Sequence, residues 1–208
     1  MIKLPVLKLL AITVIISGCA NSQYTEIYQS LKQTAFSKDL PITQEFFDDQ
    51  PFSFAKLRIG RSTPIIMVLW QVNNGHYYWV TQSGAEIITL GGKIVEVTGM
   101  EHDFQIKQNK KIKFLTQGVS ESYGLINFFN PLATSLKIKT TTRLEDSIEI
   151  FRLGSNVTAK LFSEHQVVDA IKFTSENSYY IDSSSQVIKA IQTTHPFEPE
   201  ITIEFYYK

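Results

Sequence analysis

The sequence has a single cysteine, Cys19, and its four histidines include no HxH or HExxH pattern. A lone thiol excludes an internal disulfide framework and a cysteine-based zinc site, and the histidine spacing predicts no metal centre. An excess of either charge is also missing, because 20 basic residues balance 20 acidic ones. The composition therefore gives no indication of a cofactor, of nucleic acid as a partner or of binding to an anionic membrane surface.

Runs long enough to cross a membrane are missing as well. The apolar stretches over residues 9–16 and 65–70 are far shorter than the roughly 20 residues that a spanning helix needs. We find no internal repeat, low-complexity tract or second domain. The chain has 208 residues, 43% of them hydrophobic, which is enough for one substantial core.

The amino terminus has the features of a bacterial lipoprotein signal. Lys3 and Lys8 give a positive start, residues 9–16 are apolar, and Ile16-Ser17-Gly18-Cys19 resembles the lipobox. Small residues before the cysteine give the peptidase access to the backbone, and the thiol accepts a diacylglyceryl group. The alternative is an ordinary signal peptide that ends at a cysteine without lipidation.

We therefore predict a signal peptide over residues 1–18 and a mature chain that begins at lipidated Cys19. Acyl chains such as palmitate contribute about 0.8 kcal/mol for each buried methylene, so two or three of them anchor a protein stably. The next residue is Ala20 rather than the aspartate typical of inner-membrane retention. This favours the outer membrane, with the protein facing the periplasm.

Residues 19–53 are predicted to hold the anchor, a helix and a loop. The spacing of five apolar residues indicates one amphipathic helix: Tyr24, Ile27, Tyr28, Leu31 and Ala35. Either this helix lies on the membrane or it packs on the rest of the protein. Its polar face is not basic, which favours packing. Residues 40–53 contain two prolines and are predicted to be a loop.

Residues 54–100 have the pattern of consecutive β-strands. The run over residues 65–70 predicts a strand covered on both faces, and Asn74-Gly75 is a strong hairpin signal because both residues tolerate positive φ. Ser83-Gly84 and Gly91-Gly92 predict two further turns. The predicted strands are residues 54–59, 65–70, 76–80, 85–90 and 93–98.

The remainder of the chain continues this pattern with one interruption. Residues 118–134 lack clear alternation and predict an apolar loop or a short helix, which either covers an open end of the sheet or offers a binding surface. The predicted strands are residues 104–107, 112–116, 136–139, 147–153, 157–162, 167–173, 179–182, 186–192 and 201–207. The whole pattern predicts a mainly β, single-domain antiparallel meander over residues 54–208, a barrel or half-barrel of about a dozen strands.

Two groups of residues carry a resemblance to a known family. The first is Gly75, Trp79, Ser83-Gly84, Gly91, Lys93-Ile94-Val95 and Thr98-Gly99-Met100. The second is Tyr180-Ile181-Asp182, Val187, Gln192 and Pro196. With these residues and the lipobox, the chain resembles the GfcB/YjbF family of group 4 capsule and exopolysaccharide lipoproteins.

The resemblance implies an outer-membrane lipoprotein that assists capsule or exopolysaccharide assembly or export. It also implies a large antiparallel meander similar to lipoprotein-carrier folds, and polysaccharide or export proteins as partners. The family has no established catalytic residues, so we expect no enzyme. Two alternatives stay open: a periplasmic carrier or chaperone for hydrophobic ligands, and a polysaccharide-modifying enzyme.

Few residues suggest catalysis. A His–carboxylate pair and two groups of acids could serve acid–base or glycoside chemistry, although each is also typical of a solvated turn. They are His102-Asp103, the group Glu45, Asp48 and Asp49, and the pair Glu145 and Asp146. Ser83-Gly84 lacks the GxSxG context of a serine hydrolase, and no helix follows Gly91-Gly92 as a phosphate loop requires.

An aromatic cluster provides the candidate glycan contacts: Trp70, Tyr77, Tyr78 and Trp79. Aromatic faces stack against sugar rings, so an exposed row of them suits a polysaccharide. In a strand, Tyr77 and Trp79 share one face and Tyr78 lies on the other, so one of the two faces is expected in the core. Aromatic pairing across strands is the structural alternative for this cluster.

Overall fold

The computed structural model describes residues 42–108 and 119–208, which belong to one compact unit, Lys38–Lys208. The predicted signal peptide, Cys19, the predicted amphipathic helix and the predicted strand over residues 112–116 lie outside the described residues. Across the two described ranges, no helix is both long enough and apolar enough to span a bilayer.

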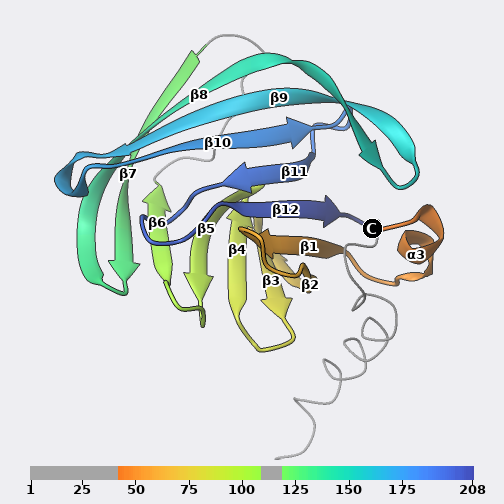
Figure 1. Ribbon diagram of the computed structural model, residues 1–208, viewed down its shortest axis with the longest axis horizontal. Helices are drawn as coiled ribbons and strands as arrows, with labels where there is room; N and C mark the ends of the chain where they lie inside the picture. Colours follow the sequence, from red (N-terminus) through yellow and green to blue (C-terminus); the bar gives the residue numbers. More distant parts are fainter. Residues whose placement is uncertain (1–41, 109–118) are drawn as a thin grey trace, which may run out of the picture. The chain divides into compact units, whose positions relative to one another are not determined.

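Within these ranges, twelve β-strands form one closed antiparallel barrel (Figure 1). Each strand pairs with the next along the chain, and β1 pairs with β12 to close the ring. The strands are β1 (Phe54–Ile59), β2 (Ile65–Asn73), β3 (His76–Thr81), β4 (Glu86–Leu90), β5 (Lys93–Thr98), β6 (Phe104–Gln108), β7 (Val119–Phe129), β8 (Leu132–Arg152), β9 (Ser155–Val168), β10 (Phe173–Ile181), β11 (Val187–Gln192) and β12 (Ile201–Tyr206). The predicted β-meander is confirmed, and the barrel is closed rather than half-open.

A short helix, α3 (Gln44–Asp49), precedes the barrel, so the predicted loop over residues 40–53 is wrong at this point. The Thr43 hydroxyl accepts a hydrogen bond from the Phe46 N–H at 3.1 Å and caps the helix. Phe46 and Phe47 of this helix pack against Phe54 at ring-centroid distances of 5.6 and 6.4 Å. The cap and this apolar anchor explain why six residues fold as a helix despite the nearby prolines.

Strands β7 and β8 contradict the prediction for residues 118–134. The described part of this segment is a hairpin that turns at Asn130-Pro131, and not a loop or a helix. Along β7 every second side chain from Ser120 to Phe128 faces inward, and the extra residue of the register shift lies on β8, between Ala133 and Leu136. The inward positions of β7 include Ser120, Ser122 and Gly124, whereas the apolar residues Tyr123, Leu125 and Phe129 are exposed. The usual alternation of apolar and polar residues therefore does not mark this strand.

Two predicted strands, residues 136–139 and 147–153, are parts of the single strand β8. A bulge between Leu144 and Asp146 separates them.

The strand predicted over residues 167–173 is wrong, because the chain turns there through a 3-10 helix, Asp169–Ile171. Lys172 completes this turn at a φ of 53°, a conformation that its residue type does not signal.

The apolar core lies inside the barrel. The largest fully buried apolar side chains come from strands around the whole ring: Trp79, Tyr179, Phe54, Phe104, Phe128, Phe205, Leu57, Met67, Ile87, Ile94 and Ile126. Opposite walls meet where the β4–β5 turn approaches β11. A Cβ atom added to Gly92 would lie 2.4 Å from Val187 Cγ1, so only glycine allows this approach.

Candidate functional site

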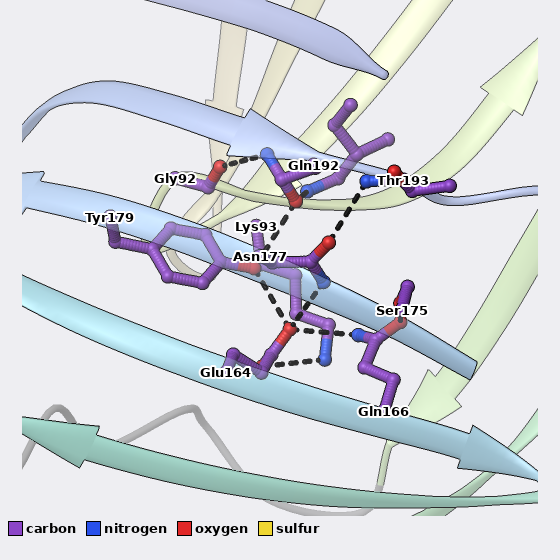
Figure 2. A network of polar contacts seen from close by, with 10 residues as sticks. Gly92, Lys93, Glu164, Gln166, Ser175, Asn177, Tyr179, Gln192 and Thr193 are labelled. Atoms are coloured by element: carbon purple, nitrogen blue, oxygen red, sulfur yellow. Dashed lines mark hydrogen bonds and ion pairs between the residues drawn. The ribbon is translucent and has the colours of Figure 1, made fainter. Parts of the chain in front are cut away.

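A buried ion pair lies inside the barrel between β5 and β9 (Figure 2). Lys93 Nζ is 2.9 Å from Glu164 Oε2, and each side chain is only 1% exposed. Burying a charge is costly unless it is paired and hydrogen-bonded. The hydrogen-bond partners of the two side chains therefore decide whether the pair could react with a substrate or only connects the two strands.

Both oxygens of the Glu164 carboxylate have hydrogen-bond partners. Its Oε1 accepts hydrogen bonds from Gln166 Nε2 at 2.8 Å, Asn177 Nδ2 at 3.0 Å and the Tyr179 hydroxyl at 2.9 Å. Burial, and then the charge of Glu164, raise the pKa of Tyr179 well above its ordinary value, so the phenol keeps its proton as a donor. Every partner of the carboxylate is thus a proton donor that stabilises its negative charge.

Two amide side chains extend the network to the backbone. The Ile94 N–H donates to Gln192 Oε1 at 2.9 Å, and Gln192 Nε2 donates to the Gly92 carbonyl at 3.0 Å. The Thr193 N–H donates to Asn177 Oδ1 at 2.9 Å. Gln192 therefore ties β11 to β5 across the barrel, in the way that a neighbouring strand would.

Polar side chains also form two rows across the inner wall of β7, β8, β9 and β10. Strand pairing places these residues side by side on the face that carries Glu164. One row is Ser120, Thr142, Glu164 and Asn177, and the other is Ser122, Thr140, Gln166 and Ser175. This part of the barrel interior is hydrophilic, whereas the inner faces of β1 and β12 are apolar.

Two of the four candidate glycan contacts lie toward the core. Trp79 has no exposed surface, and its indole N–H donates to the Thr89 hydroxyl at 2.9 Å. Tyr77 is half-buried and stacks on Trp79 with a centroid distance of 6.2 Å. The structure therefore gives Trp79 no surface for contact with a glycan.

The other two candidates, Trp70 and Tyr78, form a pair on the outer wall. Trp70 is 43% exposed, and its ring meets that of Tyr78 edge-on at a centroid distance of 5.9 Å. The Trp70 indole N–H donates to Glu86 Oε2 at 3.0 Å, which holds the ring against the sheet. Of the aromatic cluster, this pair presents the accessible surface.

The candidate acids have local partners. Asp103 accepts hydrogen bonds from the Gly99 and Met100 N–H groups at 3.0 and 2.9 Å, so it closes the β5–β6 turn. Glu145 binds Arg143 at 2.7 Å and also accepts from the Ser163 hydroxyl. Backbone groups around Asp103 and side chains around Glu145 thus explain the positions of these acids without a substrate.

Two further candidate acids, Asp146 and Asp48, and the candidate His102 also have local partners. Asp146 accepts from the Ser147 N–H at 2.7 Å, and Asp48 accepts from Gln44 Nε2 at 2.8 Å. His102 Nδ1 lies 2.9 Å from the Asn130 carbonyl oxygen. This histidine contacts the β7–β8 turn rather than forming a dyad with its neighbouring aspartate.

His102 also stacks on His195, a residue that was not among the predicted site residues. The rings are 4.7 Å apart and nearly parallel. His195 is completely buried, and burial together with His102 lowers its pKa to about 4. Its Nδ1 accepts from the Phe197 N–H at 3.2 Å, so the neutral ring carries its proton on Nε2. Within the described ranges that Nε2 has no hydrogen-bond partner.

The buried network was not predicted from the sequence, although a signal was present. On β9, Glu164 and Gln166 follow the apolar residue Phe162 at intervals of two residues, and Val168 continues the series. All four side chains therefore point to the same, buried face of the strand. Two polar residues within an apolar face predict a buried polar pair. Lys93 and Gln192 are members of the network and are also among the residues on which the family resemblance rests.

Comparisons with known proteins give a family and a similar fold. The family model described as group 4 capsule polysaccharide lipoprotein GfcB, YjbF matches residues 24–206. Among solved structures, the chain is similar to the hypothetical lipoprotein YmcC from Escherichia coli K12, with 14% identity and a TM-score of 0.73. That similarity covers 91% of this chain and 97% of the other, and at such identity it shows the fold alone. No curated protein matches the chain.

Proposed function

Because the chain belongs to the GfcB/YjbF family of group 4 capsule polysaccharide lipoproteins, we propose that it assists the assembly or export of a capsule-type polysaccharide without catalysing a reaction. In this proposal, acyl chains on Cys19 hold the protein in the outer membrane, and the barrel faces the periplasm. It works by contact with the polysaccharide or with other export proteins.

The non-catalytic part of this proposal rests on the hydrogen bonds that bind both carboxylate oxygens of Glu164. A general acid or base must exchange a proton with a substrate, and so it needs a free oxygen within reach of that substrate. Both oxygens of Glu164 are bound, one by Lys93 and the other by Gln166, Asn177 and Tyr179. This arrangement is suited to connecting β5 and β9 inside the barrel rather than to a reaction.

The same network argues for a polysaccharide-related role over the carriage of hydrophobic ligands. A carrier needs an apolar space inside the barrel. Here the inner wall of β7 to β10 carries two polar rows, and the opposite walls meet at Gly92 and Val187. We therefore place contact with the glycan on the outside of the barrel.

On the outer wall, the Trp70–Tyr78 pair is the proposed aromatic contact with sugar. Its rings are fixed by the hydrogen bond to Glu86 and by their edge-on packing, so they would lose little conformational entropy on binding. A flat apolar face with polar groups at its edge suits a sugar ring, whose hydroxyl groups lie around an apolar face.

A deletion strain tests the proposed role. Loss of the gene is expected to reduce surface polysaccharide while intracellular precursor remains, and the wild-type gene is expected to restore it. Complementation with Trp70→Ala tests the aromatic contact, and Phe197→Ala is the matched control because Phe197 is also an exposed aromatic residue, 63% exposed. Unchanged surface polysaccharide in the deletion strain would contradict the proposal.

The anchor is tested separately by metabolic labelling with palmitate. Cys19→Ala is expected to abolish the label and to release the protein from outer-membrane fractions. Label that persists in this variant would show that the acyl chains are attached elsewhere.

A further inference from the structure

The end of the β8–β9 hairpin packs on the outer wall of the barrel. Strand β10 pairs with β9 only as far as Lys160, whereas β8 and β9 stay paired to Arg152 and Ser155 (Figure 1). The free end is fastened by the Arg152 guanidinium, which donates to the carbonyl oxygens of Ile188 at 3.2 Å and of Phe205. Strands β11 and β12 therefore lie beneath it.

A groove of about 220 Å³ lies between this hairpin end and the barrel. Its lining residues are Ile150, Phe151, Arg152, Lys189 and Glu204. Glu204 alternates with the core residues Ile203 and Phe205, and Lys189 is its cross-strand partner, so both face outward. The groove is thus built from two cationic side chains, one acid and an apolar rim.

The acid in the groove already has partners. Glu204 Oε2 accepts from the Tyr206 hydroxyl at 2.9 Å and lies 4.0 Å from Lys56 Nζ. The two cations, in contrast, contact neutral groups. Arg152 binds backbone carbonyls and lies 4.2 Å from the centre of the Tyr206 ring, and Lys189 lies 5.5 Å from that of Tyr180.

No carboxylate of residues 42–108 or 119–208 lies within ion-pair distance of Arg152 or Lys189. Burial lowers the pKa of Arg152, which reflects the loss of water around its guanidinium. The charges of Glu204 and Asp182 act on Arg152 only from beyond ion-pair distance, so this partly desolvated guanidinium still gains from a ligand that places a carboxylate directly beside it. The groove is therefore prepared for a negative charge.

We propose that this groove binds an acidic sugar residue of a polysaccharide, with the sugar carboxylate between Arg152 and Lys189. The inference rests on the proposed function and adds to it the chemical class of the polymer. The planar guanidinium is suited to a carboxylate, and the aromatic rings of Tyr180 and Tyr206 already hold both cations in place. The confined volume favours a single sugar unit over a lipid surface.

The test uses full-length protein in detergent and compares trigalacturonate with maltotriose by calorimetry. We expect the acidic trisaccharide to bind and the neutral one to bind more weakly or not at all. Lys189→Gln is expected to weaken trigalacturonate binding about fivefold, and Lys189→Glu should weaken it further. Raising the salt concentration should weaken the wild type more than Lys189→Gln, because the ion pair is screened.

Lys137→Gln is the matched control, because it removes the same charge from an exposed position earlier on β8. It should leave binding unchanged, and all variants should unfold at the wild-type temperature. Equal binding of both trisaccharides, no binding of trigalacturonate, or an equal loss in Lys137→Gln would overturn the proposal. So would preferential binding to vesicles of phosphatidylglycerol that depends on Lys189.

These results are separable from those on the proposed function. If the deletion strain loses surface polysaccharide but trigalacturonate does not bind, the acidic-sugar groove is wrong and the export role stands. If trigalacturonate binds through Lys189 but the deletion strain keeps its surface polysaccharide, the role in export fails while the groove stands.

Discussion

The Lys93–Glu164 ion pair is the part of the barrel whose disruption has the clearest expected effect on stability. Lys93→Met keeps most of the length of the side chain but removes its charge, which leaves the Glu164 carboxylate 1% exposed and without a cation. Breaking one half of a buried ion pair typically costs about 3–5 kcal/mol. The three remaining donors to Glu164 Oε1 still stabilise the charge, so we expect about 3 kcal/mol, the lower end of that range.

The double variant Lys93→Met/Glu164→Gln distinguishes a paired charge from simple packing. The new amide oxygen can still accept from Gln166, Asn177 and Tyr179, and its NH₂ group then faces a neutral side chain instead of an ammonium. Replacing a buried ion pair by neutral groups is often close to neutral for stability. The double variant is therefore expected to be more stable than the sum of the two single substitutions predicts, by about 2 kcal/mol.

The assay is equilibrium unfolding in urea, followed by tryptophan fluorescence, for the four proteins of this double-mutant cycle. All four carry Cys19→Ala, so that acyl chains do not affect the measurement. A cost below about 1 kcal/mol for Lys93→Met would refute the reasoning. Strictly additive single substitutions would also refute it, because the two charges would then not be coupled.

Three further predictions concern packing, hydrogen bonding and pH. Gly92→Ala should cost about 3 kcal/mol in urea unfolding, because its Cβ would lie 2.4 Å from Val187 at a φ of +79°; Gly154→Ala, which has a φ of +80° and nothing within 4 Å, should cost only about 1 kcal/mol. An equal loss at both glycines would show that strain, and not the contact with Val187, is responsible. Trp79→Phe should cost about 1–3 kcal/mol in thermal unfolding, because it leaves the buried Thr89 hydroxyl without its donor; an unchanged melting temperature would contradict this. The pKa of His195 is lowered from 6.5 to about 4, so the unfolded chain takes up a proton first as the pH falls. Stability should therefore decrease between about pH 6.5 and about pH 4, by up to about 3 kcal/mol, and His195→Asn should flatten this dependence in urea titrations.

Local patterns in the sequence predicted most of the strands. Tight-turn residues such as Asn74-Gly75 and Gly91-Gly92 marked hairpins correctly, since both turns adopt positive φ in the structure. The predictions failed on β7, whose inward residues are partly polar and whose outward residues are partly apolar, and where Lys172 formed a turn without a glycine. In the first case the residue types do not show which face of the strand is inside the barrel, and in the second they do not show the left-handed backbone conformation of Lys172.

The candidate site was predicted only in part. The two-residue period placed Tyr77 and Trp79 on a face opposite to Tyr78, and the structure shows Trp79 in the core. The same period could not tell which face was inside. It also could not show that Lys93 meets Glu164, because these residues are 71 positions apart and on strands that do not pair.

The sequence by itself determined the β-class, the succession of hairpins and the family resemblance, because turns and alternation depend on neighbours along the chain. Only the tertiary structure decided that β1 pairs with β12, that polar rows line the inside of β7 to β10, and that a hairpin end covers a cationic groove on the outside. These features arise when the sheet closes and brings distant strands together. The residues that meet in this way are far apart in the sequence, so the residues next to each of them do not indicate which distant residue it contacts.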